Sequence, residues 1–475
     1  MADCCMPDGK KNTYDLAVIG AGSAGFSAAI TAAGQGASVA LIGHGTIGGT
    51  CVNVGCVPSK TMIRAAEALH GARAATRFPG LVGDAHVGDW RNLIAAKNDL
   101  VATLRQKKYA DLLHEYDGIS YLEGAARLNG AGVLFQGSPV AAGKIIIATG
   151  GRPAVPPISG IESVSYLTST TLLDLETLPT SLIVIGGGYI GAELAQMMAR
   201  MGVAVTVVCR SRLLPQVEPE VSDALAAAFR AEGITLHCGI TYHTCREDAT
   251  GVSVCVEENG QRIELKAERL LVATGRTPNT EALGLTAAGI VQDGRGAIAV
   301  DNRMRTSKAG VYAAGDVTDR DQFVYMAAYG AKLAALNALN GDSLVYDNNA
   351  MPWVVFSDPQ VAGVGLSEAA AKAAGHEIKT SIVLLDQVPR ALAARDTRGL
   401  IKLVADARTG RLLGGQILAP EGADSIQTLA LALRFGMTAK ALGETIFPYL
   451  TTVEGLKLAA QTFDKDLAKL SCCAG

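Results

Sequence analysis

The chain has 475 residues, a net charge of −3 at pH 7, 49% hydrophobic residues and 54 glycines. This length predicts about three domains, and the composition is typical of a large α/β enzyme with many tight turns. The charge gives no electrostatic basis for binding nucleic acid or a membrane surface. No apolar run approaches the ~18–20 residues of a membrane span, and the N-terminal segment lacks the apolar centre of a signal peptide. We therefore expect a soluble, cytoplasmic protein without stable membrane insertion.

The ten cysteines are distributed unevenly. Six fall in three close pairs: Cys4–Cys5, Cys51 with Cys56, and Cys472–Cys473. In a cytoplasmic chain of this size, close pairs indicate redox or metal chemistry rather than a structural disulfide framework. The other four are single, and we expect them to be packing residues: Cys209, Cys238, Cys245 and Cys255.

The first unit begins with a predicted buried strand at residues 14–20. A glycine turn follows, Gly20-Ala-Gly22-Ser-Ala-Gly25, and then a predicted helix at 26–34 and a strand at 38–42. This order predicts a dinucleotide site, because the first two glycines allow a tight turn and close approach of a pyrophosphate, and the third lets helix and strand pack. The acid expected after the second strand, to bind a ribose hydroxyl, is replaced by Gly43-His44. Another group or a water must serve that ribose.

Residues 48–60 carry the most distinctive motif, Gly-Gly-Thr-Cys51-Val-Asn-Val-Gly-Cys56-Val-Pro-Ser-Lys60. The stretch at 60–69 predicts a helix, so Cys56 lies at or just before a helix N-terminus, where partial positive charge favours the thiolate. Lys60 lies one turn beyond it. We predict a redox dithiol rather than two ordinary buried cysteines.

Residues 86–116 predict one long helix that carries Tyr109, followed by short strands as far as residue 142. A strand at 144–148 then ends in the motif Ala-Thr-Gly-x-x-Pro. The same plan repeats: a strand at 181–185, a glycine turn, a helix at 192–201, a strand at 203–208, and a strand at 270–273 with the same closing motif. The second turn contains Gly186, Gly188 and Gly191. This internal duplication predicts two bound dinucleotides.

The second unit differs from the first after its second strand, where Arg210 and Arg212 replace the acid. Arginines at this place suit the 2′-phosphate of NADPH, and a solvated basic turn is the alternative. Residues 308–316 predict a short strand ending at Asp316, which is either a ligand for a ribityl hydroxyl or a turn aspartate. A helix at 322–339 follows.

From residue 350 the pattern changes to an α+β domain without a glycine turn. Its predicted strands lie at 353–356, 382–385 and 400–405, and its predicted helices lie at 425–435 and 439–445. We expect this domain to serve in docking and dimerisation.

Two dinucleotide units, a C-x4-C dithiol before Val-Pro-Ser-Lys, and Ala-Ala-Gly-Asp316 together resemble the FAD-dependent pyridine nucleotide–disulfide oxidoreductases over about residues 12–463. The segment from Phe447 to Phe463 and the terminal Leu-Ser-Cys-Cys-Ala-Gly are similar to the ending of the family's mercury(II)-reducing members. Most of those carry an N-terminal metal-binding module with a C-x-x-C motif. Here only Cys4-Cys5 precede the first strand, so we expect that module to be absent or lost.

The resemblance implies an α/β fold with two Rossmann-like dinucleotide-binding domains and a C-terminal α+β interface domain, in a homodimer whose active site is shared between subunits. The implied FAD domain covers 1–160 and 286–350, the NADPH domain 161–285, and the dimerisation domain with its Cys-Cys tail 351–475.

The resemblance also implies roles for single residues. Cys56 would lie against the flavin, Cys51 would be the outer, exchanging thiol, and Lys60 and Glu193 would pair near the flavin. Tyr109 and the partner subunit's Tyr449 would line the metal's approach; packing is the alternative role for either tyrosine alone. The implied FAD contacts are Gly20, Gly22, Gly25, Gly45, Thr50, Lys60, Ala126, Asp316 and Val324, and the NADPH contacts are Gly186, Gly188, Gly191, Arg210 and Arg212.

The predicted reaction is the reduction of Hg(II) to Hg(0) by NADPH through FAD. Thiolate is the best protein ligand for this soft ion, so the ion must move by thiolate exchange. Cys472 and Cys473 would collect it from thiol complexes, and the Cys51/Cys56 dithiol would hold it beside the flavin. Adjacent cysteines are poor disulfide partners, because their Cα atoms lie ~3.8 Å apart, below the usual ~4.4–6.8 Å of a disulfide. We therefore expect this pair to stay reduced and available for the metal.

Two alternatives remain. The first is a disulfide reductase such as dihydrolipoamide dehydrogenase or glutathione reductase, which uses a C-terminal His–Glu pair as acid and base. This chain keeps Glu454 but has Tyr449 in the place of the histidine. The second is a flavoprotein that binds mercury without turnover, against which the two intact cofactor motifs argue.

Overall fold

The computed structural model describes residues 13–130, 132–318 and 320–466. Cys4, Cys5, Cys472 and Cys473 lie outside the described residues. The chain forms two compact units, each assembled from separate segments. The first contains Met1–Ser59, Asn92–Ala154 and Arg276–Tyr346, and the second contains Lys60–Arg91, Val155–Gly275 and Asp347–Gly475. No helix of the described chain is both long and apolar enough to cross a membrane.

The first unit is built on a mixed sheet with strand order β3-β2-β1-β6-β5-β4, in which β16 also pairs with β6. Strands β1, β2, β3, β6 and β16 pair in parallel, whereas β4 and β5 are antiparallel. A short ribbon, β7 with β15, lies outside this sheet. The strands are β1 Thr13–Ile19, β2 Val39–Gly43, β3 Ile119–Glu123, β4 Ala126–Asn129, β5 Gly132–Phe135, β6 Ser138–Ile147, β7 Gly151–Pro153, β15 Arg276–Pro278 and β16 Val311–Ala313.

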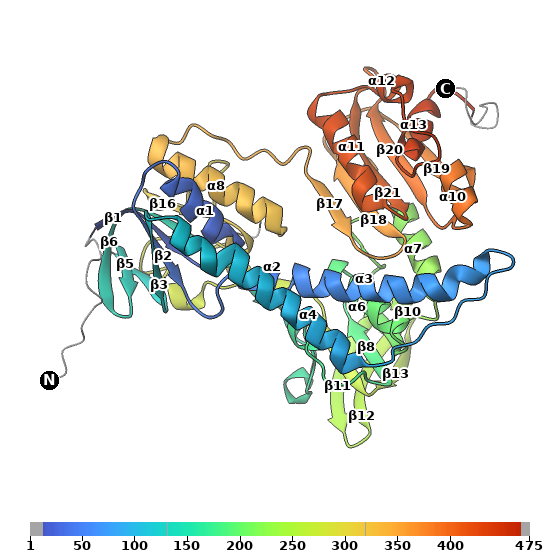
Figure 1. Ribbon diagram of the computed structural model, residues 1–475, viewed down its shortest axis with the longest axis horizontal. Helices are drawn as coiled ribbons and strands as arrows, with labels where there is room; N and C mark the ends of the chain where they lie inside the picture. Colours follow the sequence, from blue (N-terminus) through green and yellow to red (C-terminus); the bar gives the residue numbers. More distant parts are fainter. Residues whose placement is uncertain (1–12, 131, 319, 467–475) are drawn as a thin grey trace. The chain divides into compact units, whose positions relative to one another are not determined.

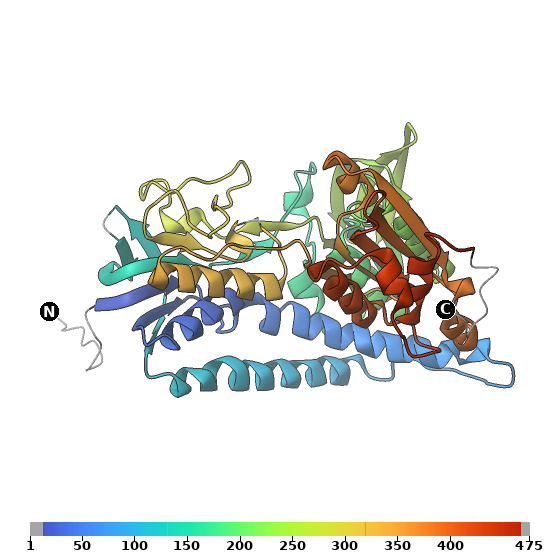
Figure 2. The ribbon, with the colours of Figure 1, turned by 90° about the horizontal axis from the view of Figure 1, so that it is seen from above.

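Two helices of the first unit, α1 (Ser23–Ala33) and α8 (Val324–Asn340), lie side by side in both views (Figures 1 and 2). The Ser27 hydroxyl of α1 donates a hydrogen bond to the Ala328 carbonyl of α8 at 2.7 Å. The central strands β1 and β2 are almost continuously apolar because parallel strands are buried on both faces. Two further helices are α2 (Gly49–Asn53) and α4 (Trp90–Arg105), whose first two residues belong to the second unit.

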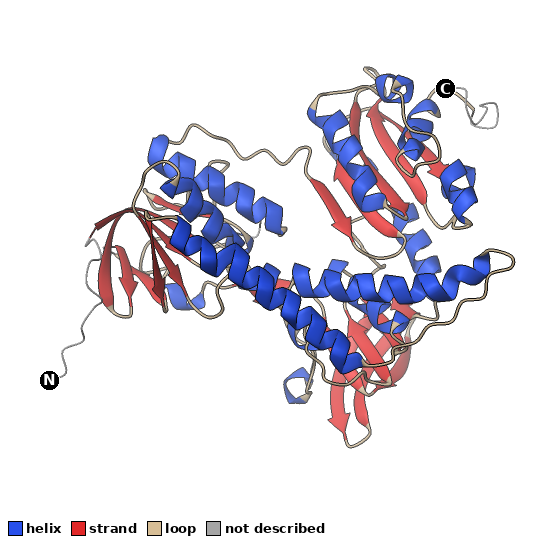
Figure 3. Ribbon diagram, in the orientation of Figure 1, coloured by secondary structure: helices blue, strands red, loops and turns tan. Residues whose placement is uncertain are grey.

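Among its described residues the second unit contains three sheets: a parallel sheet β10-β9-β8-β14, an antiparallel meander β11-β12-β13, and an antiparallel sheet β17-β18-β21-β20-β19 (Figure 3). The strands are β8 Ser181–Ile185, β9 Ala204–Cys209, β10 Thr235–Cys238, β11 Thr241–Asp248, β12 Gly251–Glu258, β13 Gln261–Ala267, β14 Arg269–Val272, β17 Pro352–Val355, β18 Gln360–Gly365, β19 Ile378–Leu384, β20 Leu400–Asp406 and β21 Leu412–Ala419. The helices are α3 Cys56–Arg73 (from Lys60 on), α5 Ser169–Leu172, α6 Tyr189–Arg200, α7 Pro219–Ala231, α9 Glu368–Ala373, α10 Pro389–Ala394, α11 Gly422–Arg434, α12 Ala439–Glu444 and α13 Glu454–Gln461.

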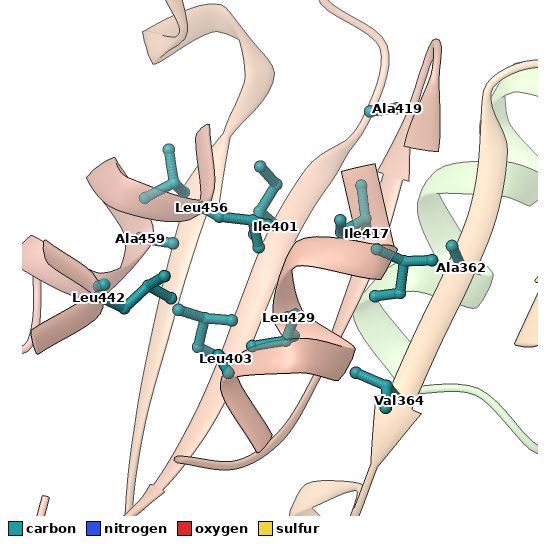
Figure 4. Packing of buried hydrophobic residues seen from close by; sticks show 14 of the residues in the cluster. Ala362, Val364, Ile401, Leu403, Ile417, Ala419, Leu429, Leu442, Leu456 and Ala459 are labelled. Atoms are coloured by element: carbon teal, nitrogen blue, oxygen red, sulfur yellow. The ribbon is translucent and has the colours of Figure 1, made fainter. Parts of the chain in front are cut away.

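The C-terminal sheet has its own apolar core. Figure 4 shows Leu403 of β20, Ile417 of β21 and Leu429 of α11 within it, and each has no exposed surface. A buried ion pair also joins this sheet to helix α7 of the same unit. The Lys402 side chain of β20 is 1% exposed, and its ammonium lies 3.0 Å from a carboxylate oxygen of Glu218, the residue before α7. Burial of such a charge is tolerated because it is paired.

The fold confirms the expected class and both dinucleotide units, and it corrects some boundaries. The helix predicted at 86–116 begins only at Trp90, because glycines at 80, 83 and 88 disfavour helix before it. α4 ends at Arg105 and gives way to a π-helical turn, η2 (Gln106–Ala110), and a 3-10 turn, η3 (Asp111–Glu115). Asp316 opens a short 3-10 turn, η6 (Asp316–Thr318), instead of ending a strand.

Truncation of Leu429 to alanine should lower the free energy of unfolding of the second unit by about 2–5 kcal/mol, because it leaves a cavity in a closed core. The two tryptophans of the chain, Trp90 and Trp353, both lie in this unit, so urea unfolding followed by tryptophan fluorescence reports on it. The control is Gln427→Ala on the exposed side of the same helix, with an expected change within about 0.5 kcal/mol. Equal losses in the two variants would contradict the core assignment.

Candidate functional site

The two glycine turns begin with the same close contact. Gly20 has φ +121°, and a Cβ on it would lie 2.2 Å from the Ala148 carbonyl oxygen. Gly186 has φ +116°, and a Cβ on it would lie 2.3 Å from the Ala273 carbonyl oxygen. Neither place accepts a side chain. The internal duplication seen in the sequence is therefore a duplication of backbone geometry.

The third glycine of each turn packs the helix onto the turn. A Cβ on Gly25 would lie 1.7 Å from the first glycine's oxygen, and a Cβ on Gly191 would lie 2.0 Å from the corresponding oxygen. The middle glycines, Gly22 and Gly188, are the N-cap residues of α1 and α6, and neither caps its helix with a side chain. A helix N-terminus of this kind suits a pyrophosphate, so both cradles fit a dinucleotide.

The dithiol segment is held on the first glycine turn through backbone atoms. The Gly48 N–H donates to the Ala21 carbonyl at 2.9 Å, and a Cβ on Gly49 would lie 2.6 Å from the Gly22 Cα. Gly48 and Gly49 have φ of +92° and +66°, which favour glycine. The Asn53 amide closes the segment by donating to the Gly49 carbonyl at 2.8 Å.

Cys56 occupies the helix start that the sequence predicted, whereas the sequence assigned no element to Cys51. Cys51 lies in α2 and Cys56 is the first residue of α3, and both are half-buried. The positive end of α3 favours a thiolate on Cys56, and Lys60 follows four residues later in the same helix. No group of three or more His, Cys, Asp or Glu side chains in the described part of the chain is arranged to hold a metal ion. A soft cation bound at Cys51 and Cys56 would therefore have two thiolate ligands.

Tyr109 lies in the π-helical turn η2, close to both cysteines. Its hydroxyl is 3.3 Å from the Ser23 hydroxyl, and its ring meets the Phe26 ring edge-on, with the centroids 4.9 Å apart. Burial raises the pKa of the Tyr109 phenol, and the thiolate charges of Cys51 and Cys56 raise it further, whereas the Ser23 hydrogen bond lowers it. The phenol is therefore a neutral hydrogen-bonding group next to the dithiol.

Lys60 and Glu193 form the expected ion pair. The Lys60 ammonium lies 2.7 Å from one Glu193 oxygen and 4.9 Å from the centre of the Phe356 ring. The Phe356 backbone N–H donates to the other Glu193 oxygen at 2.8 Å. Because the Glu193 side chain is only 7% exposed, both of its oxygens need such partners. Sequence reasoning missed the role of Phe356.

The other residues predicted to contact FAD lie in the first unit. Gly45 has φ +81° in the turn before the dithiol, Thr50 is exposed in α2, Ala126 opens β4 and Val324 opens α8. The Asp316 carboxylate accepts a hydrogen bond from the Arg276 guanidinium at 2.9 Å. Sequence reasoning missed Arg276, although it directly follows the Thr-Gly of the second closing motif.

A tyrosine lies at the place of the acid that is missing at the end of β2. A Cβ on Gly43 would lie 2.6 Å from the Tyr121 hydroxyl of β3 and 2.7 Å from the Ala21 Cβ. A longer residue at 43 would therefore displace Tyr121. This contact depends on the pairing of β2 with β3, so the sequence could not reveal it.

Arg210 and Arg212 differ in their surroundings. Arg210 is exposed just beyond β9, whereas the Arg212 guanidinium donates to the backbone carbonyls of Pro215 and Val217. Arg212 thus holds its own turn together, and its contact with a 2′-phosphate stays a prediction.

Cys209 and Cys238, expected to be separate packing residues, are instead neighbours. Their sulfur atoms lie 3.3 Å apart. The hydrogen bond from Cys209 lowers the pKa of the Cys238 thiol to about 7. The same bond, together with burial, raises the pKa of Cys209. Burial confirms the packing role of Cys209, which is 4% exposed, and of Cys245, which is 2% exposed. The sequence did not predict the contact between Cys209 and Cys238.

The segment before α13 presents Tyr449, whose surface is 47% exposed. The neighbouring Leu450 N–H donates to a Glu454 carboxylate oxygen at 3.1 Å, and Glu454 is buried. Large apolar side chains also face solvent nearby in the sequence, notably Phe435 at 78% and Ile446 at 94% exposed. Exposed apolar residues of this size are typical of association surfaces.

Comparison with known proteins places the chain in a family. Residues 14–335 match the pyridine nucleotide-disulphide oxidoreductase model, and residues 351–460 match the dimerisation domain of the same family. The chain is 46% identical to a mercuric reductase of Bacillus cereus over 100% of its own length and 75% of that protein. It is 46% identical to a mercuric reductase of Streptomyces lividans over 97% of its own length and 98% of that protein.

Among solved structures, the chain is similar to the Cu(II) complex of the HOCl-induced flavoprotein disulfide reductase RclA from Escherichia coli. The TM-score is 0.83 at 30% identity, over 95% of this chain and 100% of that one. The two glycine cradles, the dithiol segment and these matches lead to one conclusion: the chain belongs to the pyridine nucleotide-disulphide oxidoreductase family.

Proposed function

We propose that this chain is an NADPH-dependent flavoenzyme that reduces Hg(II) to Hg(0). Within the family, the residues at the C-terminal acid–base position favour a mercury(II) reductase over a disulfide reductase. Tyr449 stands where a disulfide reductase needs histidine, and the Glu454 carboxylate is used by the Leu450 N–H. Thiolate exchange of a metal ion needs no such proton donor, whereas reduction of an organic disulfide does. The long matches to mercuric reductases support the same choice.

As a member of its family the chain uses FAD and NADPH. The chemistry that bound FAD would supply is that of a hydride acceptor toward NADPH and a two-electron donor toward the metal. The first glycine cradle, with Asp316 and its partner Arg276, would hold FAD. The second cradle, with Arg210, would hold NADPH.

The Cys51/Cys56 dithiol would bind the metal as a bis-thiolate. Cys56 is the first residue of α3, and the positive end of a helix favours the thiolate, which is the form that binds the metal. Tyr109, next to both thiols, would donate a hydrogen bond to a thiolate and limit the approach of water. The Lys60–Glu193 pair would fix positive charge one turn beyond Cys56. Reduced Hg(0) carries no charge that would retain it on sulfur.

Delivery of the ion would involve a homodimer. Cys472 and Cys473 would take Hg(II) from small thiol complexes and pass it to Cys51 and Cys56 by exchange. The family's dimerisation domain supports an active site completed by Tyr449 of the partner subunit. We assign this work to the cytoplasm, where small thiols stay reduced.

A disulfide reductase is the second candidate, because the similar solved structure carries that description. NADPH oxidation separates the two functions. With excess monothiol present, we expect oxidation to depend on Hg(II) and to be negligible with glutathione disulfide or lipoamide. Rapid oxidation with a disulfide and none with Hg(II) would reverse the assignment.

Replacing both tail cysteines, Cys472→Ala with Cys473→Ala, should impair turnover of Hg(II) held by excess thiol. Reduction of the flavin by NADPH, measured in stopped flow without mercury, should stay unchanged because the tail takes no part in it. Wild-type turnover in this variant would contradict the delivery role.

Cys56→Ala should abolish the long-wavelength thiolate–flavin absorbance of the two-electron-reduced enzyme, because Cys56 is the inner thiolate. Cys51→Ala is the matched control and should retain that band. Absorption spectra during anaerobic titration with NADPH make the comparison. Persistence of the band in Cys56→Ala alone would reassign the inner thiol to Cys51.

Tyr121→Phe should weaken FAD binding about 3- to 10-fold, which is the loss of one hydrogen bond to a ribose hydroxyl. Gly43→Glu should weaken it more, because the new side chain meets the Tyr121 hydroxyl and the Ala21 side chain. Titration of the apoprotein with FAD, followed by flavin fluorescence, measures both. Unchanged FAD affinity in Tyr121→Phe would contradict a hydrogen bond from Tyr121 to the ribose and would assign that contact to a water molecule.

A further inference from the structure

Two cysteines meet at the ends of neighbouring strands in the second unit. Cys209 ends β9 and Cys238 ends β10, and the parallel register of these strands pairs the two residues directly. The Cys209 thiol donates to the Cys238 sulfur across 3.3 Å. The two positions are 29 residues apart in the sequence, so strand pairing alone creates this dithiol.

The pair connects the protein surface with the second glycine turn. Cys238 is half-buried, whereas Cys209 is only 4% exposed. A Cβ on Gly187 would lie 3.1 Å from the Cys209 sulfur, so that sulfur lies directly against the turn proposed to bind the NADPH pyrophosphate. Arg210, proposed to bind the 2′-phosphate, is the next residue after Cys209.

We propose that Cys209 and Cys238 form a second binding site for Hg(II), separate in sequence from Cys51 and Cys56, and that its occupation weakens NADPH binding. The choice of cation rests on the proposed function, because it is the enzyme's own substrate that would reach this site. A two-coordinate, thiophilic ion needs only the two sulfur ligands that the geometry supplies.

Binding is an exchange of ligands without oxidation or reduction. A thiol complex Hg(SR)2 meets the pair in its singly protonated state, in which Cys209 carries the proton. Two Hg–S bonds to the small thiol break, and two Hg–S bonds to Cys209 and Cys238 form. One RS⁻ leaves as the anion, and the other takes the Cys209 proton and leaves as RSH.

The geometry also explains why occupation affects NADPH. Two thiolates on opposite sides of one metal ion are ~4.6 Å apart if each metal–sulfur bond is ~2.3 Å, the length known for zinc. The sulfur atoms, now 3.3 Å apart, must therefore separate. Cys209 has Gly187 on one side, so its movement disturbs the glycine turn and the adjoining Arg210.

Direct binding is tested in the full-length chain with FAD bound, after Cys4, Cys5, Cys51, Cys56, Cys472 and Cys473 are all replaced by alanine. Mercury(II) chloride is added with two equivalents of a monothiol, and retained mercury is measured by elemental analysis after gel filtration. We expect this protein to retain one mercury ion per chain. The further substitution Cys238→Ser should abolish the retention, whereas Cys255→Ser should leave it unchanged. Cys255 is the matched control, a half-buried cysteine elsewhere in the same unit.

The consequence is tested by NADPH binding to the same proteins. One equivalent of mercury should raise the NADPH Kd about tenfold, the loss of roughly one charge-assisted hydrogen bond, and Cys238→Ser should abolish the effect. Absent mercury retention, or retention unchanged by Cys238→Ser, would overturn the site. Retention with an unchanged Kd would overturn the coupling. Neither result depends on turnover, so failure here is distinct from failure of mercury reduction in the wild-type enzyme.

Discussion

The contact between Gly22 and Gly49 is the constraint on which the first unit's chemistry depends. The two backbones approach so closely that a Cβ on Gly49 would lie 2.6 Å from the Gly22 Cα. The segment that carries Cys51 and Cys56 is therefore fixed to the dinucleotide turn by main chain, which has few degrees of freedom. The same run of glycines leaves room for Tyr109, since a Cβ on Gly48 would lie 3.0 Å from its ring.

Charge in the described part of the chain is arranged to favour thiolates over proton transfer. Cys56 lies at the positive end of α3. Both oxygens of Glu193 have partners, Lys60 and the Phe356 N–H, and one oxygen of Glu454 accepts from the Leu450 N–H. A soft metal ion exchanges between thiolates without needing these carboxylates, which is the physical reason for preferring it as substrate over an organic disulfide.

The internal duplication extends beyond the glycine turns to their sulfur neighbours. Each turn has a pair of cysteines close to it, but the pairs arise differently. Cys51 and Cys56 lie five residues apart on two successive helices, whereas Cys209 and Cys238 are brought together by the register of β9 and β10. An enzyme that handles a thiophilic ion exposes every accessible dithiol to it. The second pair is therefore expected to matter in mercury-rich conditions.

The sequence by itself determined the features that depend on local backbone: the glycine turns, a helix N-terminus at or just after Cys56, and the duplicated strand–turn–helix units. These could be predicted because a positive φ or a helix start constrains residue type within a few positions. The sequence also showed directly that the C-terminal histidine is missing. Only the tertiary structure decided that Tyr121 lies at the place of the acid absent at Gly43, that Arg276 pairs with Asp316, and that Cys209 meets Cys238. Each joins segments 29 or more residues apart, so strand register and packing, which no local pattern encodes, set the contact.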